Sequence, residues 1–145
     1  MKVYGLIFYF KSKLIMKKLL LGYGVVLLML TSCVAQTSGP FREIDSNTLI
    51  TFQSEKKDLL LVDVRTPEEF ADGKLKGSSN VNVKSDDFEK LINQFDKNKP
   101  IVVYCLAGMR SGKAMDIMKK NGFKEVYSLK GGIESWQKEG HPLVK

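Results

Sequence analysis

Cysteine and histidine are scarce in this chain of 145 residues, which contains only Cys33, Cys105 and His141. Three such side chains are too few for a structural zinc site, which takes four ligands, and no metal or cofactor is expected. A single disulfide would use both thiols, and none can form if Cys33 carries another modification. Cys105 is then the thiol left available for reaction.

A strong excess of positive charge is also missing once the first residues are set aside. The formal net charge is +7, but residues 1 to 32 hold five lysines and no acidic residue. The rest of the chain therefore holds 18 of the 23 basic side chains against all 16 acidic ones. This near balance removes the electrostatic argument for nucleic-acid binding.

No apolar run is long enough to span a membrane. Residues 19 to 30 are apolar, but a spanning helix needs about 20 such residues. A charged start at Met16, Lys17 and Lys18 precedes this run, and small residues follow it. This order is typical of a removable signal peptide. We expect one over residues 1–32, with Met16 as the candidate true start.

The segment Leu30-Thr31-Ser32-Cys33 resembles the lipobox of bacterial lipoproteins. That resemblance implies acylation of Cys33; the alternative is a plain secretory signal followed by a chance cysteine. Residues 33–40 lack periodicity and are expected to form a lipidated tether. Acyl chains contribute about 0.8 kcal/mol per buried CH₂. We therefore expect an exported protein, lipid-anchored in the bacterial cell envelope, facing the periplasm or on the outer membrane.

The most informative stretch is residues 101–111, where four strand-forming residues lead into Cys105 and a helical pattern follows. The thiol is thus predicted at the junction between a buried strand and the start of a helix. Backbone N–H groups and the positive end of the helix favour an anion at such a junction. The sequence therefore predicts a stabilised thiolate.

The residues after the cysteine support that chemistry. A free thiol titrates near ~8.5, but beside a guanidinium at a helix N-terminus the pKa can fall to roughly 3.5–7.5. Arg110 is the candidate guanidinium, Gly108 permits a positive φ, and Ser111 is a candidate helix cap. The alternative is that Cys105 is an ordinary buried core thiol, because free cysteine is among the most buried residue types.

The pattern Cys-x-x-Gly-x-Arg-Ser resembles the active-site loop of the rhodanese family of sulfurtransferases. Residues 62–70 (VDVRTPEEF) and the Gly131-Gly132-x-x-x-Trp136 segment resemble two further motifs of that family, in the same order. The resemblance implies a single-domain rhodanese-like sulfurtransferase over residues 41–145, with Cys105 carrying a persulfide. It implies substrate-binding residues in the loop, namely Leu106, Ala107, Gly108, Met109, Arg110 and Ser111.

The length of the loop distinguishes a rhodanese-like sulfurtransferase from a cysteine-dependent phosphatase. Those enzymes use Cys-x5-Arg, because a wider ring of amides is needed around a tetrahedral phosphate. Here four residues separate Cys105 from Arg110. The loop is better sized for a sulfur bonded to the cysteine, and a phosphatase is the weaker alternative.

Two further groups are expected to support the site. Thr66, Pro67 and Glu69 predict a capped helix start. We interpret Asp63, Arg65 and Glu69 as one ion-pair and hydrogen-bond network that shapes the site without taking part in bond making. Gly131 and Gly132 are expected to allow a close backbone approach beside the loop.

A catalytically silent rhodanese-like binding module remains the main alternative. Where the family usually has Gly-His-Ile-Pro-Gly-Ala, this chain has Lys74 and Lys76 in place of the histidine and proline, and Leu106 and Met109 are apolar. If the enzyme is active, this apolar loop favours an uncharged polysulfide or a thiol persulfide over thiosulfate as donor. The expected partners are that small donor and a thiol or cyanide acceptor, and a monomer is expected.

Alternating strands and helices predict one α/β domain with a mainly parallel sheet and helices on both faces. The loop would lie at the carboxyl end of its strand, where such sheets bind ligands. One expected helix runs from a Ser85 cap to Phe95, with Phe88, Leu91, Ile92 and Phe95 facing inward.

Overall fold

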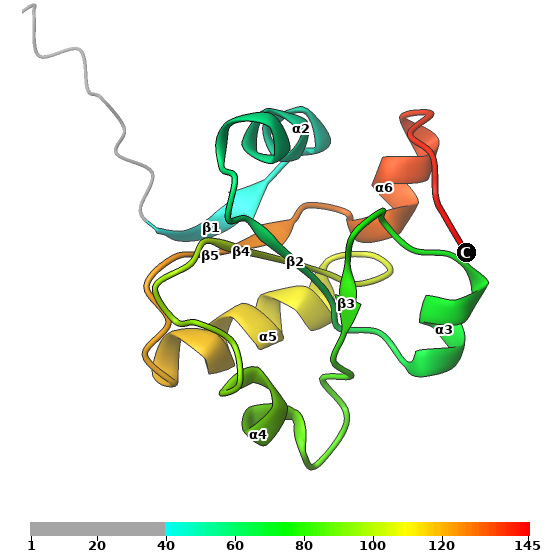
Figure 1. Ribbon diagram of the computed structural model, residues 1–145. Coiled ribbons are helices and arrows are strands. Elements are labelled where there is room, and N and C mark those ends of the chain that lie inside the picture. The colour runs from blue at the N-terminus through cyan, green and yellow to red at the C-terminus, as the bar shows by residue number, and fades with distance from the viewer. Residues whose placement is uncertain (1–39) are drawn as a thin grey trace, which may run out of the picture. The chain divides into compact units, whose positions relative to one another are not determined.

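Five short parallel strands form the centre of the structure, a computed structural model that describes residues 40–145. Their order across the sheet is β1-β5-β4-β2-β3, so β4 lies in the middle (Figure 1). Every neighbouring pair is parallel. The strands are β1 (Phe41–Ile44), β2 (Leu60–Asp63), β3 (Ser79–Asn80), β4 (Ile101–Tyr104) and β5 (Val126–Leu129).

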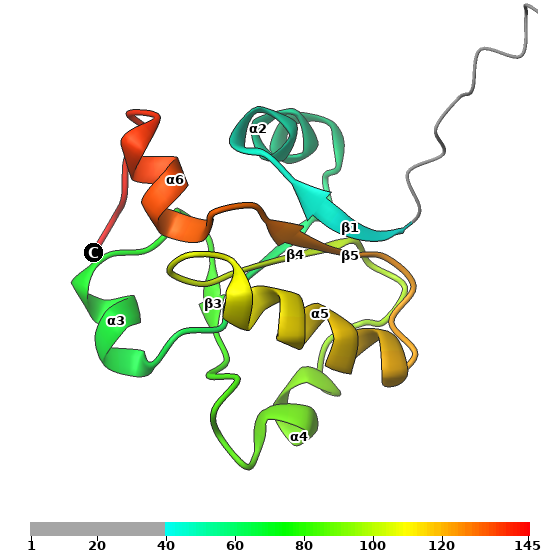
Figure 2. The same cartoon turned by 180° about the vertical axis from the view of Figure 1, so that it is seen from behind.

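Helices cover both faces of this sheet, as predicted. They are α2 (Ser46–Glu55), α3 (Pro67–Asp72), α4 (Phe88–Ile92), α5 (Met109–Lys120) and α6 (Gly132–Lys138). Figures 1 and 2 show α2 and α6 on one face and α4 and α5 on the other. The shorter helix α3 lies at the end of the sheet that carries β3 (Figure 1).

The central strand β4 contributes to both hydrophobic cores because successive side chains point to opposite faces. Ile101 and Val103 belong to the core beneath α4 and α5, and Val102 and Tyr104 to the core beneath α2 and α6. All four are fully buried. This explains why the strand is a continuous apolar run, as is usual for a parallel strand covered on both sides.

Helix-capping signals in the sequence are confirmed. The Asp45 carboxylate accepts from the Thr48 amide at 2.8 Å and caps α2. Thr66 and Glu69 form the predicted capping box at the start of α3, with Pro67 as its first residue. These short-range contacts orient the helices that flank the site.

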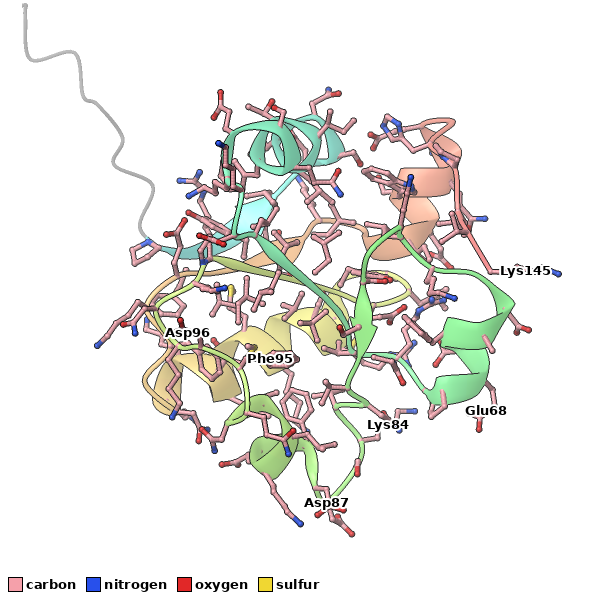
Figure 3. The ribbon with its side chains drawn as sticks, in the orientation of Figure 1. Glu68, Lys84, Asp87, Phe95, Asp96 and Lys145 are labelled. Carbon is pink, nitrogen blue, oxygen red and sulfur yellow. The ribbon has the colours of Figure 1, made fainter. Side chains whose placement is uncertain are left out.

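The predicted helix from Ser85 to Phe95 is wrong in its extent. Helix α4 covers only Phe88–Ile92, and the Ser85 hydroxyl accepts from the Asp87 amide in the turn before it. Leu91 is exposed, whereas Phe88 and Ile92 are buried and Phe95 packs partly buried against the core. Glu68, Lys84 and Asp87 point away from the domain (Figure 3).

The predicted signal peptide and almost all of the predicted tether, residues 1–39, lie outside the described residues. Among residues 40–145, no helix combines the length and hydropathy needed to cross a bilayer.

Candidate functional site

Cys105 directly follows β4, and α5 begins four residues later. Gly108 is the residue that caps α5, with the positive φ of +100° that the sequence predicts. The loop turns back so that the Gly108 amide donates to Cys105 Sγ at 3.2 Å. The prediction of Ser111 as the helix cap is wrong. Ser111 is the third residue of α5, and its hydroxyl donates to the Gly108 carbonyl at 2.9 Å.

The environment of the Cys105 sulfur is buried but polar. The residue is 1% exposed and belongs to the core beneath α5. Burial alone would raise the pKa of the thiol. Hydrogen bonds from the amide and hydroxyl of Ser111 and from the amides of Gly108 and Ala107 outweigh burial and lower the pKa of Cys105. An ordinary core thiol has no such donors, so the geometry favours the thiolate.

Arg110 forms a two-pronged ion pair with Glu69. The guanidinium nitrogens lie 2.7 and 2.6 Å from the two carboxylate oxygens. The hydrogen bond from Arg110 holds the pKa of Glu69 at about 2, against an ordinary value of 4.5. The same bond raises the pKa of Arg110, with a smaller contribution from Cys105. The thiolate is therefore stabilised mainly by the amides and hydroxyl of its own loop, because a carboxylate already neutralises the guanidinium.

Asp63 and Arg65 form a separate pair at the end of β2. Arg65 Nη2 donates to Asp63 Oδ2 at 2.6 Å and to the Gly73 carbonyl at 2.6 Å, and both side chains are buried. The Asn80 amide bridges the Asp63 and Arg65 carbonyls at 3.0 Å each. The predicted hydrogen-bond network therefore holds for Asp63 and Arg65 but is wrong for Glu69, whose side chain bonds to Arg110 and to the Thr66 amide. Glu69 interacts with Arg65 through charge.

Gly131 and Gly132 bring the start of α6 against the cysteine loop, as expected. The amide of Ile133 donates to the Cys105 carbonyl at 2.9 Å. Both glycines have positive φ, and a Cβ at Gly132 would lie 2.4 Å from the Cys105 carbonyl oxygen. Only a residue without a side chain fits there, so this turn fixes the backbone on which the sulfur sits.

Ser128 is the site residue that sequence reasoning missed. Its side chain on β5 is fully buried, and its hydroxyl donates to the Ser111 hydroxyl at 2.9 Å. The Ser111 hydroxyl in turn lies 3.6 Å from Cys105 Sγ. A polar residue inside the buried strand 126–129 was the available signal, because buried polar groups usually serve a hydrogen bond.

Comparison with known proteins agrees with this geometry. The family model described as a rhodanese-like domain matches residues 48–139. The chain belongs to the rhodanese-like domain family. The rhodanese-like domain accounts for most of the part of the chain that the structure describes.

Relatives of this rhodanese-like domain include two proteins with sulfurtransferase names. A sulfurtransferase of Allochromatium vinosum is 33% identical over 102 residues, which cover 70% of this chain and 94% of that protein. The thiosulfate sulfurtransferase GlpE of Shewanella oneidensis is 33% identical, covering 66% of this chain and 92% of the relative. The crystal structure of a rhodanese-related protein from Thermoplasma volcanium superposes with a TM-score of 0.63 at 28% identity, covering 71% and 97% of the two chains.

The rim of the loop in this rhodanese-like domain is apolar. Leu106 is 40% exposed and Met109 is 88% exposed, while Ala107 between them is also exposed. Lys74, which replaces the histidine usual in the family, places its ammonium over the Phe70 ring at 4.8 Å from the centroid. Lys76 is exposed. None of the four departures from the family pattern is bonded to the Cys105 sulfur in a described contact.

Proposed function

We propose that this rhodanese-like domain is an active sulfurtransferase that carries a sulfane sulfur as a persulfide on Cys105. The observation that supports this most directly is the polar surroundings of one buried sulfur: the Gly108 amide donates to Cys105 Sγ at 3.2 Å, and the Ser111 hydroxyl lies 3.6 Å from it. A sulfur that bears negative charge is stabilised there, and the thiolate is the nucleophilic form of cysteine. The sulfurtransferase names of relatives at 33% identity point the same way.

The first step forms the persulfide. The Cys105 thiolate attacks the terminal sulfur of a donor R–S–SH, and the bond between the two donor sulfurs breaks. The thiolate R–S⁻ leaves with the bonding electron pair, and the terminal sulfur stays on Cys105 as Cys–S–SH. Backbone amides of the loop face the reacting sulfur and stabilise the charge that passes through it.

The second step regenerates the enzyme. An acceptor thiolate R′–S⁻ attacks the outer sulfur of the persulfide, forming R′–S–SH and releasing the Cys105 thiolate. With cyanide as acceptor and the persulfide ionised, the products are thiocyanate and the same thiolate. This two-step exchange is ping-pong, because the first product leaves before the acceptor enters.

A thiol persulfide or an uncharged polysulfide is the donor class that we propose. Leu106 and Met109 make the exposed rim of the loop apolar, and Glu69 neutralises Arg110. A doubly charged donor such as thiosulfate gains little from such a rim, because Arg110, the cation of the described loop, is already paired with Glu69.

Mass spectrometry after incubation with a sulfane donor tests the proposed activity. An active enzyme gains the mass of one sulfur atom on the peptide that carries Cys105 and loses it again when cyanide is added. Cys105→Ala is the control and gains nothing at that position. A wild-type protein that stays unmodified with every donor identifies the silent binding module instead.

A second experiment tests the donor class. Rates of thiocyanate formation are compared with thiosulfate and with glutathione persulfide at equal concentrations. We expect the persulfide to react faster. A clear preference for thiosulfate would contradict the donor assignment and leave the persulfide mechanism intact.

The cellular location is a separate proposal that rests on the sequence. We propose that the chain is exported, acylated at Cys33 and held at a membrane of the cell envelope, where it acts as a monomer because one chain supplies the loop. Growth with a labelled fatty acid should label the wild-type protein, and Cys33→Ser should abolish the label and release the protein to the soluble fraction. An unlabelled wild-type protein would favour a plain secretory signal.

A further inference from the structure

Three side chains form a line of contacts that ends at the reactive sulfur: Ser128 contacts Ser111, and Ser111 contacts Cys105. Ser128 Oγ donates to Ser111 Oγ at 2.9 Å, and Ser111 Oγ lies 3.6 Å from Cys105 Sγ. All three residues are at most 1% exposed. Because solvent does not reach these side chains, each hydroxyl proton has only a few possible acceptors, all of them protein atoms.

The direction of the first bond restricts the second. A serine hydroxyl has one proton to donate and two lone pairs to accept with. Ser128 uses its proton on Ser111, so Ser111 keeps its own proton for either the Gly108 carbonyl, at 2.9 Å, or Cys105 Sγ. A protonated thiol is compatible with the first choice, and a thiolate attracts the proton to the sulfur.

We infer that Ser128 is a positioning residue for the sulfur chemistry: its hydroxyl holds and polarises the Ser111 hydroxyl so that Ser111 donates to the Cys105 thiolate. Accepting a hydrogen bond makes a hydroxyl a stronger donor, and this cooperativity is largest where water is excluded. That Ser128 assists sulfur transfer rests on the proposed function. That Ser128 favours the ionised form of Cys105 does not depend on it.

Charged side chains on the neighbouring elements also influence the ionisation of Cys105, so their contribution must be distinguished from that of the Ser128 hydroxyl. They are Arg110 on α5, Glu69 on α3, Glu134 at the start of α6, and Asp63 and Arg65 at the end of β2. Arg110 is paired with Glu69, and Asp63 with Arg65. A substitution of Ser128 changes none of these charges, so a change in the ionisation of Cys105 reports the hydroxyl.

The test is the pH dependence of alkylation at Cys105. The full chain is treated with iodoacetamide over a range of pH, and mass spectrometry follows the peptide that carries Cys105, so that Cys33 does not interfere. We expect Ser128→Ala to move the midpoint up by about half a pH unit, a roughly threefold lower rate below both midpoints. Ser128→Thr keeps a hydroxyl and should keep the wild-type midpoint.

Substitution of Ser111 tests whether Ser128 acts on Cys105 through the Ser111 hydroxyl. Ser111→Ala removes the direct donor and should raise the midpoint by about one pH unit. The double variant with Ser128→Ala should match Ser111→Ala alone, because Ser128 acts through Ser111. A double variant that shifts further, or a folded Ser128→Ala with the wild-type midpoint, would overturn the inference.

Two controls keep the outcome clear. Ser78→Ala removes another partly buried hydroxyl, which bonds to the Leu75 carbonyl and to the Tyr104 hydroxyl in the core on the opposite face of the sheet, and should leave the midpoint unchanged. If Ser128→Ala does not fold, Ser128→Val and Ser128→Thr, which are similar in size, give the same comparison. A shift in midpoint without any sulfur transfer would uphold this inference and contradict the proposed function.

Discussion

Gly132 lies so close to Cys105 that the missing side chain is part of the site. A Cβ at Gly132 would stand 2.4 Å from the Cys105 carbonyl oxygen and 2.5 Å from that of Leu106. The same turn supplies the amides of Ile133 and Glu134, which donate to those two carbonyls. The position of the sulfur therefore depends on a backbone contact with residues about 27 positions away in the sequence.

Gly132→Ala should destabilise the protein by about 3 kcal/mol. Left-handed backbone at φ +60° costs about 1–2 kcal/mol for a residue with a side chain, and the clash with two carbonyls adds the rest. Urea denaturation measures the change. Gly122→Ala is the matched control: φ is +85°, but nothing lies within 4 Å of its Cβ, so it should bear the backbone cost alone. Equal losses in the two variants would contradict the close contact.

Glu69→Gln should lower the free energy of unfolding by about 1 kcal/mol, because both members of its pair with Arg110 are partly exposed to solvent. The amide can still accept the Thr66 backbone bond, so the helix cap survives. Releasing the Arg110 charge should also lower the pKa of Cys105 and speed alkylation at pH values below its midpoint. Glu68→Gln, at an exposed neighbouring position, should change neither quantity.

Acid should remove the contribution of Glu69 within a defined range of pH. Its pKa is about 2 in the folded protein and 4.5 ordinarily, so the pair with Arg110 contributes fully above 4.5 and loses its contribution as the pH falls toward 2. The stability difference between wild type and Glu69→Gln should be constant near neutral pH and close over that range. Urea midpoints of both proteins across it provide the measurement; a difference that persists at the acid end would count against the pair.

Asp63→Asn should destabilise the protein by about 3–5 kcal/mol, because the Arg65 guanidinium stays buried without its partner. The midpoint for alkylation of Cys105 in the folded protein should not move, because neither residue bonds to the sulfur loop in a described contact. Asp58→Asn is the control, since Asp58 is exposed and lies 3.7 Å from an exposed Lys99. A shifted midpoint would contradict this prediction and show that the Asp63–Arg65 pair influences the ionisation of Cys105.

Patterns that depend on near neighbours were predictable. The run 101–104, the turn at Gly108, the Thr66 capping box and the pair of glycines at 131–132 each follow from residues a few positions apart. The helix predicted from Ser85 to Phe95 was wrong in its extent, because turns before Phe88 and after Ile92 limit α4 to five residues. Within so short a helix only Phe88 and Ile92 are buried, and Leu91 is exposed although it fits the periodic pattern.

The sequence by itself determined that Cys105 stands between a strand and a helix of this rhodanese-like domain, because an apolar run, a glycine and a helical pattern follow one another within residues 101–111. Only the tertiary structure decided which groups face one another around it. Arg110 meets Glu69 across 41 positions, and Ser128 meets Ser111 across 17. The parallel order of β2, β4 and β5 sets those distances, since it brings the ends of strands remote in the chain to one edge of the sheet.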